Sequence, residues 1–190
     1  MIEAQQQQLS HYLQLLQRWN KVYNLTAVRN PAQMQLLHLD DSLSVAPFMR
    51  GETCLDVGSG AGLPGIPLAI VQPERQFTLL DTNGKKTRFM QQAVLELGLK
   101  NVKVIQTRVE SWQPPAKFDA IISRAFASLA DFVSFTGQHL QEGGILYAMK
   151  GRYPEAELAE LPAGWHVTAR HPLQVTGLDA ERHLLEIQRG

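Results

Sequence analysis

The stretch LDVGSGAGLPGIPLA, residues 55–69, places four glycines directly after a short apolar run. Two cofactor-binding patterns overlap on it. Its last three glycines match the G-x-G-x-x-G fingerprint of dinucleotide-binding proteins, whereas Asp56 with Gly58, Gly60 and Gly62 matches the D-x-G-x-G-x-G pattern of proteins that bind S-adenosylmethionine (SAM). The residues around the glycines have to decide between the two cofactors.

The position of the preceding strand favours SAM. The run TCLDV at 53–57 predicts a buried strand that leads straight into Gly58, so the tight turn begins two residues before the dinucleotide pattern would start. A pyrophosphate needs a helix N-terminus without a carboxylate beside it, whereas the Asp56 carboxylate suits the ammonium and sulfonium of SAM. A P-loop is excluded because no Lys-Ser or Lys-Thr pair follows the glycines.

After Gly51 the sequence alternates short apolar runs with helix-like segments. Strands are predicted at 53–57, 76–81, 102–108, 118–123 and 143–150, and helices at 66–72, 85–98 and 128–140. This order predicts a mostly parallel sheet that is covered on both faces. Two final runs, 165–175 and 182–189, have only a loop between them and should pair antiparallel. We therefore predict an α/β fold of the class I SAM-dependent methyltransferase type, a Rossmann-like seven-stranded sheet with an antiparallel C-terminal hairpin.

The first fifty residues read as a helical cap. Apolar residues recur at three- and four-residue intervals over 9–19, which predicts an amphipathic helix whose Trp19 packs in the core. A second helix is expected to start at Pro31 and to run to Pro47. We expect one domain over 1–190, with the cap at 1–50 and the SAM-binding core at 51–190.

The composition limits the partners. Lys and Arg total 18, as do Asp and Glu, so the formal net charge is +0 and any nucleic-acid site must be local. The only cysteine, Cys54, lies within an apolar run and is expected to be core. It excludes an internal disulfide and a thiolate metal cluster, and we expect no metal. No signal-peptide or membrane-spanning run is present, which predicts a cytoplasmic protein without a membrane partner. We expect the protein to be a monomer.

Acidic residues follow two more strands. Asp81 ends the second strand, where a carboxylate can accept two hydrogen bonds from ribose hydroxyls. The third strand ends in TRVE, which would place Val109 against an adenine face and Glu110 near the adenine amine. For either acid alone, a solvated strand end is about as common a role.

The choice of methyl acceptor is narrowed by the catalytic motifs that the chain lacks. Methylation at carbon 5 of a pyrimidine needs a cysteine nucleophile, but Cys54 lies inside a strand. The fourth strand ends in SRAF rather than in the Asn/Asp-Pro-Pro-aromatic motif of enzymes that methylate exocyclic amines. Asp119 stands at the wrong end of its strand for ribose 2'-hydroxyl methylation. The remaining acceptors carry an available lone pair; guanine N7 is one, and small molecules and proteins stay open.

Basic residues fall near the same sheet edge. Arg124, Lys150 and Lys85 lie at or just after strand ends, so their charges should converge on the site. We expect Arg124 to act near the cofactor and the acceptor base. The cap would extend an RNA-binding patch with Arg18, Lys21 and Arg29. The motif HLDDS at 38–42 could bring a histidine and an aspartate together, and we expect a structural or lid contact there.

Several motifs together resemble one family. They are WNKVYNLT, HLDDS, LDVGSGAGLPGIPLA, LLDTNGKK, RVE, SRAFASL, YAMKG and LDAERHLLEI. The chain resembles the bacterial 16S ribosomal RNA guanine-N7 methyltransferase family, also called glucose-inhibited division protein B. The resemblance implies transfer of a methyl group from SAM to one guanine in the decoding-region loop of 16S ribosomal RNA (rRNA) or of the small subunit, with S-adenosylhomocysteine as product.

By motif, the resemblance places SAM around Gly58, Leu63, Val109, Glu110 and Arg124. For an acceptor with an available lone pair, we expect catalysis by orientation, without an acid or base residue. Two rival functions remain open. A small-molecule methyltransferase would label a metabolite but not rRNA, and an RNA-binding or SAM-sensing module would bind SAM without producing S-adenosylhomocysteine.

Overall fold

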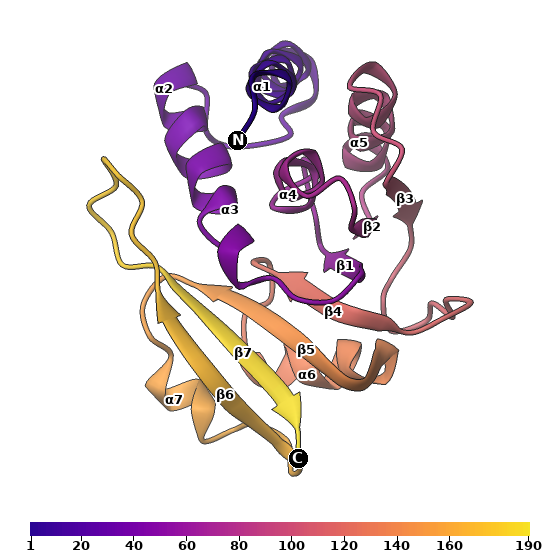
Figure 1. The fold of residues 1–190 in the computed structure, drawn as a ribbon, viewed down its shortest axis with the longest axis vertical. Helices are drawn as coiled ribbons and strands as arrows, with labels where there is room; N and C mark the ends of the chain where they lie inside the picture. The colour runs from indigo at the N-terminus through magenta and orange to yellow at the C-terminus, as the bar shows by residue number, and fades with distance from the viewer.

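A computed structural model describes all residues from 1 to 190 as one seven-stranded sheet with helices on both faces (Figure 1). The strand order is β3-β2-β1-β4-β5-β7-β6. The strands are β1 (Thr53–Val57), β2 (Gln76–Asp81), β3 (Val102–Gln106), β4 (Phe118–Ser123), β5 (Leu140–Lys150), β6 (Trp165–Pro172) and β7 (His183–Arg189). The first five run parallel, and β7 is antiparallel to both of its neighbours. The predicted fold class and C-terminal hairpin are confirmed.

Helices cover the two faces unequally (Figure 1). The helices are α1 (Glu3–Tyr23), α4 (Gly65–Val71), α5 (Gly84–Glu96), α6 (Leu129–Thr136) and α7 (Glu155–Leu158). Side chains of α1, α4 and α5 belong to the larger apolar cluster, and those of α6 belong to a smaller cluster on the opposite face. Two of these helices start where the sequence offers a capping side chain: Asn83 accepts two backbone N–H groups at α5, and Ser128 accepts one at α6.

Helix α1 packs on α4 and α5 and reaches the glycine turn. Its Tyr12 and Trp19 both lie against Phe89 of α5, with ring centroids 6.2 Å and 5.7 Å apart, so Trp19 packs against the core as expected. The fully buried Tyr12 donates its hydroxyl to the carbonyl of Ala61 at 2.7 Å. The cap is thereby tied to the loop that follows β1.

The helix expected from Pro31 to Pro47 is present in part, but it is not one regular α-helix. The segment consists of α2 (Pro31–Met34), a π-helical stretch η1 (Gln35–Asp40), α3 (Asp41–Leu43) and a 3-10 turn η2 (Ala46–Phe48). Its start at Pro31 is as expected, since the Asn30 side chain accepts the N–H groups of the first turn. A π turn accommodates extra backbone within a helix and changes which side chains face inward. A periodicity of 3.6 residues cannot anticipate that change.

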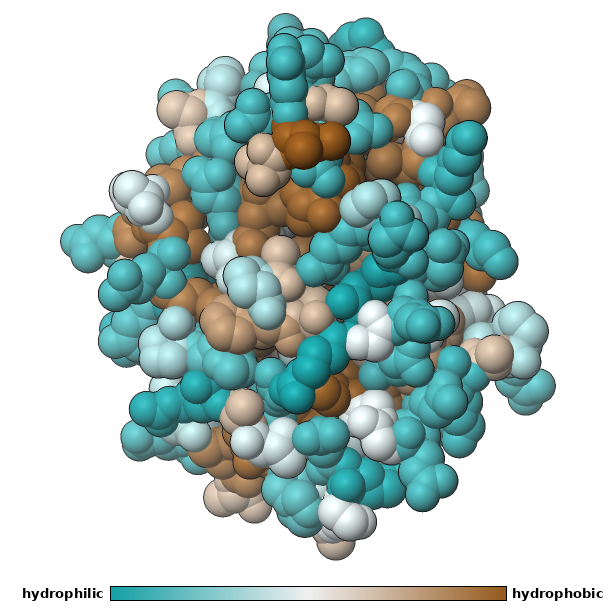
Figure 2. Space-filling model, viewed as in Figure 1, coloured by the Kyte–Doolittle hydropathy of each residue, from teal (hydrophilic) through white to brown (hydrophobic).

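Strand ends differ slightly from expectation. The strand expected at 102–108 ends at Gln106, so the TRVE residues form a turn, and β5 begins at Leu140 instead of 143. Cys54 is fully buried in β1, as expected. On the face drawn in Figure 2, hydrophobic residues appear in patches separated by hydrophilic side chains. None of the helices has the length and apolar character needed to cross a bilayer.

Candidate cofactor and acceptor site

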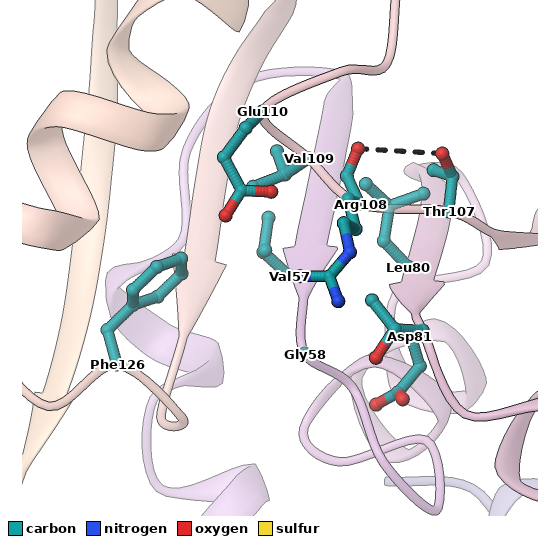
Figure 3. A pocket seen from close by; sticks show the side chains of 10 residues that line it. Val57, Gly58, Leu80, Asp81, Thr107, Arg108, Val109, Glu110 and Phe126 are labelled. Atoms are coloured by element: carbon teal, nitrogen blue, oxygen red, sulfur yellow. Dashed lines mark hydrogen bonds between the residues drawn. The ribbon is translucent and has the colours of Figure 1, made fainter.

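A cavity of about 180 Å³, open to solvent, lies at the carboxyl edge of the parallel strands (Figure 3). It is formed by residues at or just after the ends of β1, β2, β3 and β4, the position where open α/β sheets bind their ligands. Its lining consists of Val57, Gly58, Leu80, Asp81, Thr82, Thr107, Arg108, Val109, Glu110 and Phe126.

The glycine turn owes its shape to backbone conformations that other residues rarely adopt. Gly58, Gly60 and Gly62 have φ angles of +69°, +62° and +92°. At Gly58 an added Cβ would also come within 2.9 Å of the Ala125 Cβ, whereas at Gly60 it would meet nothing within 4 Å. Gly62 packs against Ile66. Gly58 is therefore the glycine that both turns the chain and lines the cavity.

Asp56 lies beneath this turn and does not line the cavity. Asp56 is only 1% exposed. Its Oδ2 accepts hydrogen bonds from the Ser59 hydroxyl at 2.7 Å and from the Gly65 N–H at 2.9 Å. Its Oδ1 is buried without a hydrogen-bond partner. Burial raises the pKa of this carboxyl to about 7, because the two donors only partly offset the cost of removing the charge from water. A cation nearby would favour the ionised form.

Asp81 is fixed at the cavity by the backbone. Its Oδ2 accepts the Gly60 N–H and its Oδ1 accepts the Asn83 N–H, both at 2.8 Å. The carboxylate thus joins the turn after β1 to the turn after β2. Each oxygen keeps a lone pair that can accept a further hydrogen bond.

The turn after β3 forms the opposite wall. Val109 is buried, and its carbonyl accepts a hydrogen bond from His139 Nε2 at 2.9 Å. This bond fixes the backbone of the turn at Val109, a residue that lines the cavity. In Figure 3 the Glu110 carboxylate lies toward Phe126, whereas the guanidinium of Arg108 extends toward Asp81.

Sequence reasoning missed Arg108 and Phe126 as lining residues. Both lie shortly after strand ends, Arg108 beyond Gln106 of β3 and Phe126 beyond Ser123 of β4. Asp81 was located by the rule that ligands bind at the carboxyl ends of parallel strands, and the same rule would have found both residues. Leu63, in contrast, does not line the cavity; it is 2% exposed and belongs to the apolar cluster below the turn.

Arg124 lies outside the cavity lining, between the end of β4 and the cap. Its Nη1 is 3.6 Å from Asp41 Oδ2 and 3.5 Å from the Leu37 carbonyl. Burial, and then the charge of Arg124, lower the pKa of His38. His38 bonds through Nε2 to the Thr26 hydroxyl at 2.9 Å, so it does not pair with Asp41. The HLDDS motif has a structural contact, as expected.

Two of the expected RNA-binding residues are engaged within the protein. Lys150 Nζ lies 3.0 Å from a Glu157 oxygen and 3.4 Å from two carbonyls of the loop after β4. Arg18 Nη2 lies 3.4 Å from Glu96, the last residue of α5 and thus at the end of α5 remote from the cavity. The structure therefore does not bring Arg18 and Lys150 to the cavity as free charges.

Lys85 and Lys21 differ from these two. Both are exposed and neither forms a salt bridge. Lys85 lies in the first turn of α5, directly after the β2 end that carries Asp81. Lys21 lies in the last turn of α1.

Known structures share this fold. A glycopeptide N-methyltransferase solved with SAM superposes with a TM-score of 0.68 at 12% identity, covering 80% of this chain and 94% of that one. A SAM-dependent methyltransferase from Thiobacillus denitrificans, solved with S-adenosylhomocysteine, gives a TM-score of 0.61 at 15% identity over 90% of this chain and 96% of that one. At such identities the likeness establishes the class I methyltransferase fold.

Sequence relatives are much more similar. The ribosomal RNA small subunit methyltransferase G of Marinobacter nauticus is 56% identical over 98% of this chain and 87% of its own length. The protein of the same name from Methylococcus capsulatus is 54% identical over 97% of this chain and 89% of its own length. The family model described as rRNA small subunit methyltransferase G matches residues 5–185. The chain therefore belongs to the rRNA small subunit methyltransferase G family.

Proposed function

We propose that this protein transfers the methyl group of SAM to N7 of a guanine in the decoding-region loop of 16S rRNA. Membership of the family and the methyltransferase fold support SAM-dependent methylation of small-subunit rRNA. The choice of N7 follows from the family resemblance, and the cavity supports it, because its lining includes no histidine, lysine or cysteine that could deprotonate an acceptor or attack it.

The residues present fit SAM. Asp81 presents fixed oxygens that can accept the ribose hydroxyls, and Val109 and Phe126 provide apolar surface for the adenine, with Glu110 near its edge. Asp56, whose Oδ1 has no partner, lies beneath the turn, and its ionised form would favour the positive charge of the methionine end. When bound, SAM supplies an electrophilic methyl group on a sulfonium.

The protein then has to align two partners and to exclude water. Guanine N7 carries a lone pair and no proton, so the acceptor needs no general base. Orientation of this kind can lower a barrier by ~7 to 11 kcal/mol in favourable intramolecular cases. The cavity acids, Asp81 and Glu110, are assigned to the nucleoside, and Arg124 lies between the cavity edge and the cap, where an acceptor base would approach.

The partner is 16S rRNA or the small ribosomal subunit, and the protein acts in the cytoplasm as a monomer. Lys85 and Lys21 are the RNA-contact candidates, because their ammonium groups have no acidic partner. Such contacts make RNA affinity fall with rising salt.

The test supplies SAM with a tritiated methyl group to 16S rRNA from cells that lack this protein. We expect incorporation into one position, identified after digestion as 7-methylguanosine. Labelling of a metabolite extract but not of rRNA would favour a small-molecule methyltransferase. Binding of SAM in calorimetry without any S-adenosylhomocysteine produced would favour a sensing module.

A further inference from the structure

Asp41 joins three segments that are distant in the sequence. It is the first residue of α3 and is 5% exposed. Its Oδ1 accepts Nε of Arg182 at 2.9 Å, and its Oδ2 lies 3.6 Å from Nη1 of Arg124. Arg124 directly follows β4, and Arg182 directly precedes β7. One buried carboxylate therefore connects the cap to the carboxyl edge of the sheet at two places.

The π-helical stretch explains how the cap presents this carboxylate. The N–H of Asp41 bonds to the carbonyls of Leu36 and His38 as the π turn ends and α3 begins. His38, Asp41 and Ser42 are the buried polar residues of this segment. Single π turns inside helices often occur at functional sites, and here the turn places an acid where two guanidinium groups meet.

The charges in this cluster do not balance. One carboxylate faces two guanidinium groups, so one positive charge remains uncompensated among the three side chains. Arg124 and Arg182 keep 28% and 26% of their side-chain surface exposed. Nε and Nη2 of Arg124 form no hydrogen bond within the protein. Donors thus remain free for an anionic or carbonyl-bearing ligand while one end of the fork is held.

We propose that Asp41 is a positioning residue, which orients Arg124 toward the acceptor with Arg182 as a brace on the other carboxylate oxygen. The inference rests on the proposed function, since it assumes that the acceptor is RNA. Asp41 does not touch the cavity lining, so its effect passes through Arg124 to the acceptor and not to the cofactor. The cluster provides the fixed guanidinium, and the uncompensated charge favours a polyanion at this edge.

The test is Asp41→Asn, which keeps the shape and removes the charge. We expect kcat for methylation of 16S rRNA to fall at least tenfold, while the SAM dissociation constant stays within twofold by calorimetry. RNA binding should not weaken, because the change adds one net positive charge at this edge. Asp41→Glu retains the carboxylate and should be more active than Asp41→Asn.

Glu186→Gln is the matched control. It also removes the charge of a buried carboxylate shared by two basic side chains, but in the middle of β7. If both variants lose kcat equally, or if Asp41→Asn loses SAM affinity, the role is structural and the proposal is overturned. A kcat within twofold of wild type overturns it as well.

Arg182→Ala decides the matter if Asp41→Asn does not fold. It removes the brace from a partly exposed position, and we expect a smaller fall in kcat with unchanged SAM affinity; a kcat within twofold of wild type would refute the inference. The wild-type protein separates this result from the proposed function. If the wild type does not methylate rRNA, the proposed function fails, whereas an active wild type with equally active variants removes only the role of Asp41.

Discussion

Asp56 on β1 and Glu186 on β7 are acidic residues with almost no exposed surface, 1% and 2%, in the parallel and antiparallel parts of one sheet. Neutral donors hold Asp56, and one of its oxygens has no partner. Glu186 pairs through Oε2 with Arg50 and through Oε1 with His171 Nε2 at 2.9 Å. The two parts of the sheet thus bury a carboxyl group in opposite ways.

The surroundings of Glu186 explain the difference. His171 stacks on Phe48 of η2 with ring centroids 4.1 Å apart, and the Tyr147 hydroxyl donates to the Phe48 carbonyl at 3.0 Å. This cluster fastens the end of the cap to the antiparallel strands with its charges paired. Asp56 is paired with no cation, and it lies under the turn that borders the cavity. A buried acid that is incompletely satisfied is suited to a cationic ligand, whereas a fully paired acid is suited to fastening.

The largest effect is expected at the glycine turn above Asp56. Gly58→Val would place a β-branched residue at a φ of +69° and a Cβ 2.9 Å from Ala125. Strain and overlap of this kind cost about 3 kcal/mol, and we expect SAM affinity to fall more than about a hundredfold in calorimetry.

Gly98→Ala is the control for backbone strain alone. Its φ of +64° is similar, but its Cβ would meet nothing within 4 Å, and it follows α5 at the end remote from the cavity. SAM affinity should remain unchanged. Unchanged affinity in Gly58→Val would show that the turn does not border the cofactor.

The next largest effect tests the fastening role of Glu186. Arg50→Ala leaves a buried carboxylate short of a partner, whereas Glu186→Gln leaves an arginine whose side chain is 65% exposed and can be hydrated. We expect Arg50→Ala to lower the free energy of unfolding by about 2 to 4 kcal/mol, and Glu186→Gln by about 1 to 2 kcal/mol. Urea unfolding measures both. The reverse order would mean that the ion pair does not stabilise this part of the sheet.

A pH dependence distinguishes Asp56 from Glu186. The pKa of Asp56 is about 7 in the folded state, and its ordinary value is 3.8. Between these two pH values the carboxyl is therefore protonated in the folded protein and ionised in the unfolded chain. Its contribution to stability is therefore present at low pH and is lost as pH rises from about 4 to about 7. The free energy of unfolding should be measured for the wild type and for Asp56→Asn across this pH window. The difference between the two should isolate the pH dependence that Asp56 contributes.

SAM binding should follow the same carboxyl with the opposite sign. A cation bound near Asp56 favours its ionised form, so binding releases a proton below about pH 7, and affinity should rise by up to about tenfold per pH unit there. Calorimetry in buffers with different ionisation enthalpies measures the released proton. If no proton is released and affinity is flat in pH, Asp56 does not sense the cofactor.

The sequence predicted the parallel core well because buried strands read as continuous apolar runs. The strands at 53–57, 76–81 and 118–123 have the expected bounds, and Asp81 lies at the cavity. What could not be predicted depends on tertiary contacts. The π turn at 35–40, the Tyr12 bond to the glycine turn and the two arginines that share Asp41 join segments whose pairing no local pattern encodes. The division into one domain stays a prediction.

The smallest effect is expected for an exposed ion pair far from both carboxylates. Arg18 is 66% exposed at the side chain and faces Glu96 at 3.4 Å, a geometry in which solvent screens most of the attraction. Arg18→Ala should change the free energy of unfolding by less than about 0.5 kcal/mol and leave KM for rRNA within twofold. Lys21→Ala removes a cation of the same helix that has no acidic partner, so it should raise KM more than Arg18→Ala does. Equal effects of the two substitutions would mean that the pairing of Arg18 with Glu96 does not keep its charge from the RNA.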